Sequence, residues 1–114
     1  MDRRIQERYP FELQVRVTEV EHPELSSSGQ AYDVSQSGIG VYLPLRLTIG
    51  SAVRLNINDT VLFGFVVHSE PDRSYFRTGI AVLQVLIGDS DLSQLLKATL
   101  KEVMPKLEWL ETLR

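Results

Sequence analysis

Two groups of polar side chains have the clearest capacity for chemistry, one near the start of the chain and one in a short turn. The first group is Arg3, Arg4 and Arg8, and the second is the stretch 33–38, which reads Asp-Val-Ser-Gln-Ser-Gly. Guanidinium groups are always charged, bind phosphate oxygens in pairs and stack on aromatic bases. Together the two groups are suited to an anionic, nucleotide-like ligand.

The turn offers three residues with distinct abilities. Asp33 can accept hydrogen bonds from two adjacent donors, such as the N1–H and exocyclic amine of guanine, and Ser35 can donate to phosphate or accept from a base. Gly38 allows backbone angles closed to other residues and a close ligand approach. Taken alone, the residues leave two other interpretations open. These are a solvated N-terminal arm with scattered charges, and a turn that satisfies only its own backbone.

Composition limits the class of protein. The chain has 114 residues, of which 43% are hydrophobic and 24% charged, typical of one globular domain. A net charge of −3 argues against a partner that is a nucleic acid polymer, which would require a broad basic face. The absence of cysteine, a charged N-terminus and the lack of a long apolar run predict a cytoplasmic protein without a membrane span.

Catalytic readings have little support in the sequence. Ser35 and Ser37 have no local general base, and His22 and His68 lack metal-ligand spacing. The histidines are interpreted as ordinary surface or partly buried residues. Gly38-Ile-Gly40 precedes a strand, whereas a dinucleotide fingerprint would require a helix. We therefore expect a binding protein, not an enzyme, with no cofactor and no metal.

Alternation of apolar and polar residues predicts a series of short strands. It is clearest in Phe11–Val17, and the last strand contains Gly79, where a bulge or close backbone approach is expected. Residues 21–30 and 69–74 are predicted to be connections, the first exposed and mobile. The expected strands are 11–17, 29–34, 39–43, 52–57, 61–68 and 75–86. Such spacing favours a sandwich or a small barrel.

The periodicity becomes helical after Gly88. Asp89, Ser90 and Asp91 are good N-cap residues, and leucines then recur at helical spacing, with Pro105 breaking or restarting the helix. The apolar stripe is interpreted mainly as core packing. Any part that the core leaves exposed would favour a homo-oligomer.

Read together and in order, the two polar groups match a known pattern. Arg4-Ile-Gln-Glu-Arg8 fits an RxxxR segment before the first strand, and Asp33-Val-Ser-Gln-Ser-Gly38 fits a (D/N)xSxxG segment after it. The sequence thus resembles the PilZ domain family, receptors for the bacterial second messenger cyclic di-GMP, over about residues 2–87. The Gly38-Ile-Gly40 continuation and the stretch Arg77-Thr-Gly79-Ile80 agree with it.

The resemblance implies a fold and a domain organisation. The fold is a six-stranded antiparallel β-barrel of the PilZ-like, split-barrel type, followed by one or two α-helices. A single domain would span residues 1–114, with a flexible arginine arm at 1–10, a barrel at 11–87 and a helical segment at 89–114.

The resemblance also implies roles for the residues. Arg4 and Arg8 would clasp the phosphates and guanine of cyclic di-GMP, and Asp33, Ser35 and Gly38 would line the other side of the guanine. Arg3, just before RxxxR, would favour a stacked pair of ligands. The ordered arm would then change the surface seen by an unidentified effector protein. The alternative is a PilZ-like protein-interaction module that works without nucleotide.

Overall fold

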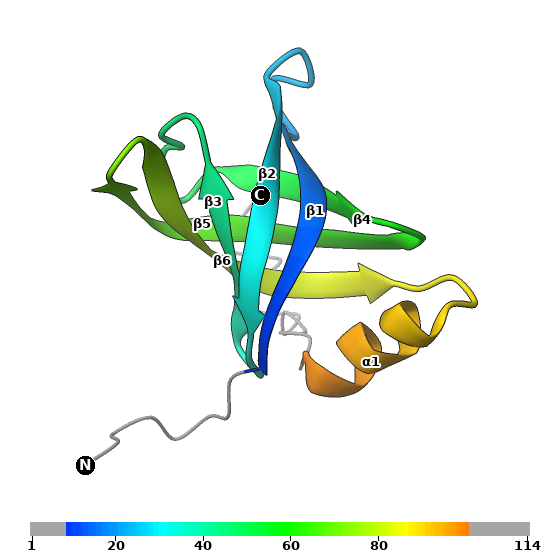
Figure 1. Ribbon diagram of the computed structural model, residues 1–114. Coiled ribbons are helices and arrows are strands. Elements are labelled where there is room, and N and C mark those ends of the chain that lie inside the picture. The colour runs from blue at the N-terminus through cyan, green and yellow to red at the C-terminus, as the bar shows by residue number, and fades with distance from the viewer. Residues whose placement is uncertain (1–8, 101–114) are drawn as a thin grey trace.

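Six antiparallel strands form a closed barrel in this computed structural model, which describes residues 9–100 and side chains from Leu13 onward (Figure 1). In chain order the elements are β1 (Tyr9–Glu19), β2 (Ser26–Val34), β3 (Gly38–Leu43), β4 (Ala52–Ile57), β5 (Thr60–Asp72), β6 (Tyr75–Leu86) and α1 (Asp91–Thr99). Around the barrel the order is β1-β2-β3-β6-β5-β4, and β4 pairs with β1 to close it. Closure removes the free strand edges. The predicted fold class is confirmed.

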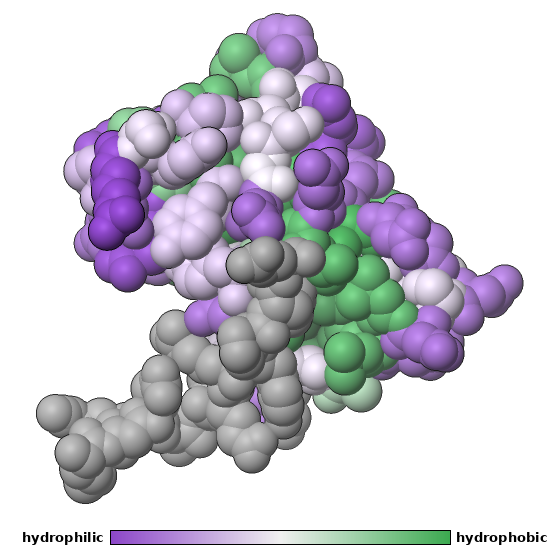
Figure 2. All heavy atoms as spheres, in the orientation of Figure 1, coloured by the Kyte–Doolittle hydropathy of each residue, from purple (hydrophilic) through white to green (hydrophobic). Residues whose placement is uncertain are grey.

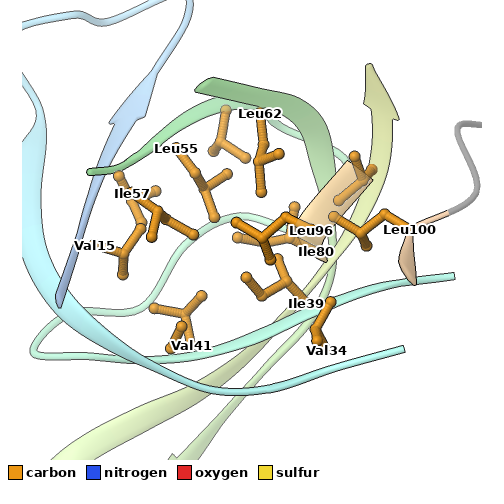
Figure 3. Close-up of a cluster of buried hydrophobic side chains, with 14 of the residues drawn as sticks. Val15, Val34, Ile39, Val41, Leu55, Ile57, Leu62, Ile80, Leu96 and Leu100 are labelled. Atoms are coloured by element: carbon orange, nitrogen blue, oxygen red, sulfur yellow. The ribbon is translucent and has the colours of Figure 1, made fainter. Parts of the chain in front are cut away.

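The barrel interior follows from the alternation in the sequence. On β1, Val15 and Val17 are buried whereas Gln14 and Arg16 are exposed, as predicted, and the side chain of Glu12 lies outside the described residues. Burying apolar side chains in this way is the main favourable term in folding. The core also receives Leu96 and Leu100 from the C-terminal helical region (Figure 3). Its remaining members are Ala31, Val34, Ile39, Val41, Leu43, Leu47, Val53, Leu55, Ile57, Leu62, Val66, Ile80, Val82 and Val85.

Helix α1 is attached to the barrel through its N-terminus. Ser90, one of the three N-cap candidates in the sequence, is the N-cap, and its side chain accepts a hydrogen bond from the Ser93 backbone N–H at 3.0 Å. Asp59, in the β4–β5 turn, accepts from the Ser90 N–H at 2.9 Å and from the Ser90 hydroxyl at 2.5 Å. The buried Thr60 hydroxyl donates to Ser93 Oγ at 2.8 Å. The predicted continuation past Leu100, including Pro105, lies outside the described residues.

The strands are longer than the sequence predicts. Ser26 to Ser28, expected in a loop, belong to β2, because they pair with Thr18, Val17 and Arg16 of β1. The hydroxyls of Ser26 and Thr18 also lie 3.2 Å apart. The expected connection 69–74 is likewise mostly strand. Its turn is confined to Arg73 and Ser74, with Arg73 at φ 61°. Cross-strand pairing has overridden the turn signals of serine and proline.

The visible surface divides by polarity. Figure 2 shows polar or weakly polar residues over β2 and β3 and an apolar area beside α1. Exposed apolar side chains include Leu86 and Ile87, just before α1, and Leu95 on it. Among the described residues, no helix is long and apolar enough to cross a membrane.

Candidate functional site

The stretch 33–38 forms the end of the β2–β3 hairpin. The Ser35 backbone N–H donates to the Gly38 carbonyl oxygen at 2.9 Å, and the Ser35 and Ser37 hydroxyls lie 3.3 Å apart. Val34 pairs with Ile39 where the loop joins the strands. The loop therefore satisfies part of its own backbone, and this hairpin holds its polar side chains at one end of the barrel.

These side chains line a surface pocket of about 220 Å³. The structure brings three predicted site residues together there, namely Asp33, Ser35 and Gly38. The other lining residues come from the same hairpin and from β5 and β6: Tyr32, Ser37, Ile39, Gly40, Val67, His68, Gly79, Ile80 and Ala81. The other three predicted site residues, Arg3, Arg4 and Arg8, lie outside the described residues.

Gly38 is required for a reason other than backbone angles. Of the described glycines, Gly50 is the one with positive φ, at +91°. Gly38 is buried and pairs with Ala81 of β6, and a Cβ atom on it would collide with the Ile80 carbonyl oxygen. The absence of a side chain thus lets β3 approach β6 closely beside the pocket.

Two glycines provide a floor without side chains. Gly40 on β3 pairs with Gly79 on β6, and both line the pocket. Gly40 also pairs with Asp33 on β2, and Gly79 pairs with His68 on β5. Asp33, Gly40, Gly79 and His68 therefore form one row across four strands, with polar side chains at its ends and two residues without side chains between them.

The walls over this floor are an aromatic ring on one side and an imidazole on the other. A Cβ on Gly40 would lie 2.6 Å from the Tyr32 hydroxyl oxygen and 2.8 Å from Asp33 Oδ1. A Cβ on Gly79 would lie 2.6 Å from Cδ2 of His68. Tyr32 is further supported by Tyr42, since the ring centroids are 4.5 Å apart.

Sequence reasoning missed Tyr32 and His68 as pocket residues. The expected close approach at Gly79 was the available signal, because a glycine within a strand leaves space that a neighbouring side chain can occupy. Which side chain occupies that space depends on strand register. Both residues adjoin register irregularities, between Ala31 and Asp33 and between Val66 and His68. These irregularities cannot be read from alternation alone.

The described residues that line the pocket supply no positive charge for an anionic ligand. Among its described lining residues, Asp33 is the acidic one and there is no lysine or arginine. However, β1 enters the barrel beside the motif, since Tyr9 pairs with Val34 and Pro10 pairs with Asp33. Arg8 directly precedes Tyr9 in the sequence. The described fold thus begins on the strand that pairs with the pocket hairpin.

Metal chemistry finds no support in the described part of the chain. Across residues 9–100, no group of three or more histidine, cysteine, aspartate or glutamate side chains could hold a metal ion. The pocket instead combines a carboxylate, hydroxyls, an imidazole and a flat backbone floor. Such a set can hold a planar, hydrogen-bonding ligand.

The comparisons agree with the fold and with the family resemblance. The family model described as the PilZ domain matches residues 2–99 of the chain. The chain belongs to the PilZ domain family. PilZ domains are binding and regulatory modules associated with cyclic di-GMP, and the matched range includes both the arginines and the Asp33–Gly38 stretch.

A solved structure has the same fold as this PilZ domain. The chain is similar to the Bacillus subtilis inhibitor of motility, MotI/DgrA, with a TM-score of 0.61 and 19% sequence identity. The match covers 84% of this chain and 48% of that protein, so the chain spans about half of its length. At this identity the likeness shows the fold alone. No match was found among curated proteins.

Proposed function

We propose that this PilZ domain is a receptor that binds cyclic di-GMP in the pocket at the end of the β2–β3 hairpin. The observation that carries the proposal is the convergence of Asp33, Ser35 and Gly38 on one pocket with a glycine floor. Asp33 would accept hydrogen bonds from the N1–H and amino group of guanine, and Ser35 would bond phosphate or base. Tyr32 and His68, which lie over Gly40 and Gly79, would form the walls against which a flat base packs.

The phosphates of the ligand require cations, and the proposal assigns this role to Arg4 and Arg8. Guanidinium groups bind phosphate oxygens through paired, charge-assisted hydrogen bonds. The entry of β1 beside Asp33 supports the assignment, because it fixes the start of the strand next to the pocket. In the sequence, Arg8 directly precedes this strand and Arg4 lies four residues before Arg8.

In the proposed mechanism, binding of cyclic di-GMP changes the surface of the domain. In the proposal, the ligand phosphates gather Arg3, Arg4 and Arg8 against the barrel, which alters the face that an effector protein meets. Part of the interaction energy is offset by the ordering of these long side chains. No catalytic step is involved, and we propose that residues 1–114 act as one domain.

Calorimetric titration with cyclic di-GMP tests the site. Asp33→Ala and Arg8→Ala should each weaken binding roughly ten- to hundredfold, because a hydrogen bond to a charged group contributes about 1.5–3 kcal/mol. The matched controls are Asp72→Ala and Arg54→Ala. Each removes a charge of the same sign as the corresponding site variant, at a residue outside the described pocket lining. Controls that lose as much affinity as the site variants would refute the assignment.

The second candidate is a PilZ-like interaction module that works without nucleotide. The exposed apolar side chains Phe65 and Val67 on the outer face of β5 favour it. The same titration separates the two functions. If the wild-type protein does not bind cyclic di-GMP, the receptor function is excluded and the interaction module is the candidate function that remains.

A further inference from the structure

His68 has a position that the motif does not explain. It lies on β5 opposite Gly79, where the ladder register shifts between Val66 and His68. Its ring covers Gly79, and the atom nearest to the site of a Cβ there is Nε2. Both residues line the pocket. The Nε2 edge of the imidazole is therefore turned toward the glycine floor.

The two ring nitrogens of His68 have different surroundings. Nδ1 is buried and is the one buried side-chain nitrogen or oxygen within residues 13–100 that has no hydrogen-bond partner. A buried N–H without an acceptor is rarer in proteins than an acceptor without a donor. This asymmetry places a ring proton on Nε2 in preference to Nδ1. The imidazole then presents a hydrogen-bond donor beside Gly79.

We propose that the His68 Nε2–H is a binding contact that donates to N7 of the bound guanine and orients the base. The proposal rests on the proposed function and deepens it. Asp33 and His68 stand at opposite ends of one row, with Gly40 and Gly79 between them. Neighbouring strands are about 4.8 Å apart, so the row spans roughly 14 Å along the sheet. The side chains of Asp33 and His68 both extend over the glycines from the row's ends.

Guanine has the complementary arrangement of groups. Its N1–H and amino group form a donor edge for the Asp33 carboxylate, while N7 and O6 are acceptors on another edge. Adenine presents an acceptor in place of the N1–H, which would face the carboxylate unfavourably. The acceptor at Asp33 therefore selects guanine over adenine. The donor at His68 fixes the orientation of the base, because N7 is an acceptor in both purines.

The test is titration of the full chain with cyclic di-GMP. His68→Phe keeps a flat ring over Gly79 but removes the donor, and it should weaken cyclic di-GMP binding roughly tenfold. His68→Gln can return an amide N–H close to the Nε2 position, and it should restore most of the affinity. His22→Phe, a change at an exposed histidine outside the pocket, is the control and should bind as wild type does.

An analogue of cyclic di-GMP with carbon in place of guanine N7 tests the same contact without a substitution. The wild type should bind it roughly tenfold more weakly than cyclic di-GMP, whereas His68→Phe should bind both equally. Equal affinity of the wild type for both compounds would overturn the proposal even if His68→Phe failed to fold.

The outcomes separate the two proposals. If Asp33→Ala loses binding while His68→Phe binds cyclic di-GMP as wild type does, the His68 contact is wrong and the receptor function stands. If the wild type does not bind cyclic di-GMP, both proposals fail.

Discussion

Gly40 and Gly79 lie directly opposite each other in the β3–β6 ladder, and each is covered by a side chain from the next strand outward. Tyr32 extends over Gly40 and His68 extends over Gly79. Any larger residue at either glycine would displace one of these walls. The pocket therefore depends on two residues without side chains as much as on the polar groups around it.

Gly40→Ala should weaken cyclic di-GMP binding while leaving the barrel folded. The new methyl group would lie 2.8 Å from Asp33 Oδ1 and 2.6 Å from the Tyr32 hydroxyl, so both side-chain ends must move. Loss of the Asp33 contact corresponds to about 1.5–3 kcal/mol. Calorimetry measures the affinity and thermal unfolding checks the fold. Wild-type affinity in this variant would contradict the glycine floor.

Gly38→Ala should act on stability instead. Its methyl group would meet the backbone carbonyl of Ile80, which cannot rotate away as a side chain can. Separating β3 from β6 should lower the free energy of unfolding by about 1–3 kcal/mol, the usual cost of overpacking. Urea denaturation measures this value. An unfolding midpoint equal to that of the wild type would contradict the close approach of β3 and β6 at Gly38.

Arg3 predicts the stoichiometry of binding. If its guanidinium contacts a second, stacked nucleotide, calorimetry should give two molecules of cyclic di-GMP per wild-type chain and one per Arg3→Ala chain. The physical reason is an added cation and stacking face beside a charged ligand. One nucleotide per wild-type chain would count against this role, and Arg16→Ala serves as the arginine control because Arg16 is exposed on β1 and does not line the pocket.

Asp59 predicts a pH dependence of stability that is separate from the pocket. The hydrogen bonds from the Ser90 side chain and then from its backbone lower the pKa of Asp59 below its ordinary value of 3.8. Because the folded-state pKa is lowered, this stabilisation is present above pH 3.8 and is lost as the pH falls through the folded-state value.

The matched variant for this dependence is Asp59→Asn, which keeps the size of the side chain and removes its charge. It should be less stable than the wild type at pH 7, and the difference should shrink as the pH falls below 3.8. Chemical denaturation at a series of pH values measures it. A difference that stays constant down to low pH would show that the charge is irrelevant to the cap.

Much of the fold can be predicted from the alternation of apolar and polar residues and from turn and helix-capping residues. The pocket can be predicted only in part. The bounds of β4, Ala52–Ile57, and of β6, Tyr75–Leu86, follow from local pattern, as does the Ser90 cap. The assignment of Ser26–Ser28 to β2 does not, because it depends on pairing with β1. Asp33, Ser35 and Gly38 are contiguous and follow from a motif. Tyr32 and His68 are brought to the pocket by register shifts that no single strand encodes.

The most direct test of the central claim is to follow the backbone amides by NMR during a titration with cyclic di-GMP. The account predicts that the amides of Ser35, Gly38, Gly40 and Gly79 shift, because they surround the pocket floor and its hairpin. The amide of Asp59, in the β4–β5 turn, should stay in place. Large shifts confined to residues outside the pocket, or no shifts in a folded protein, would contradict the account.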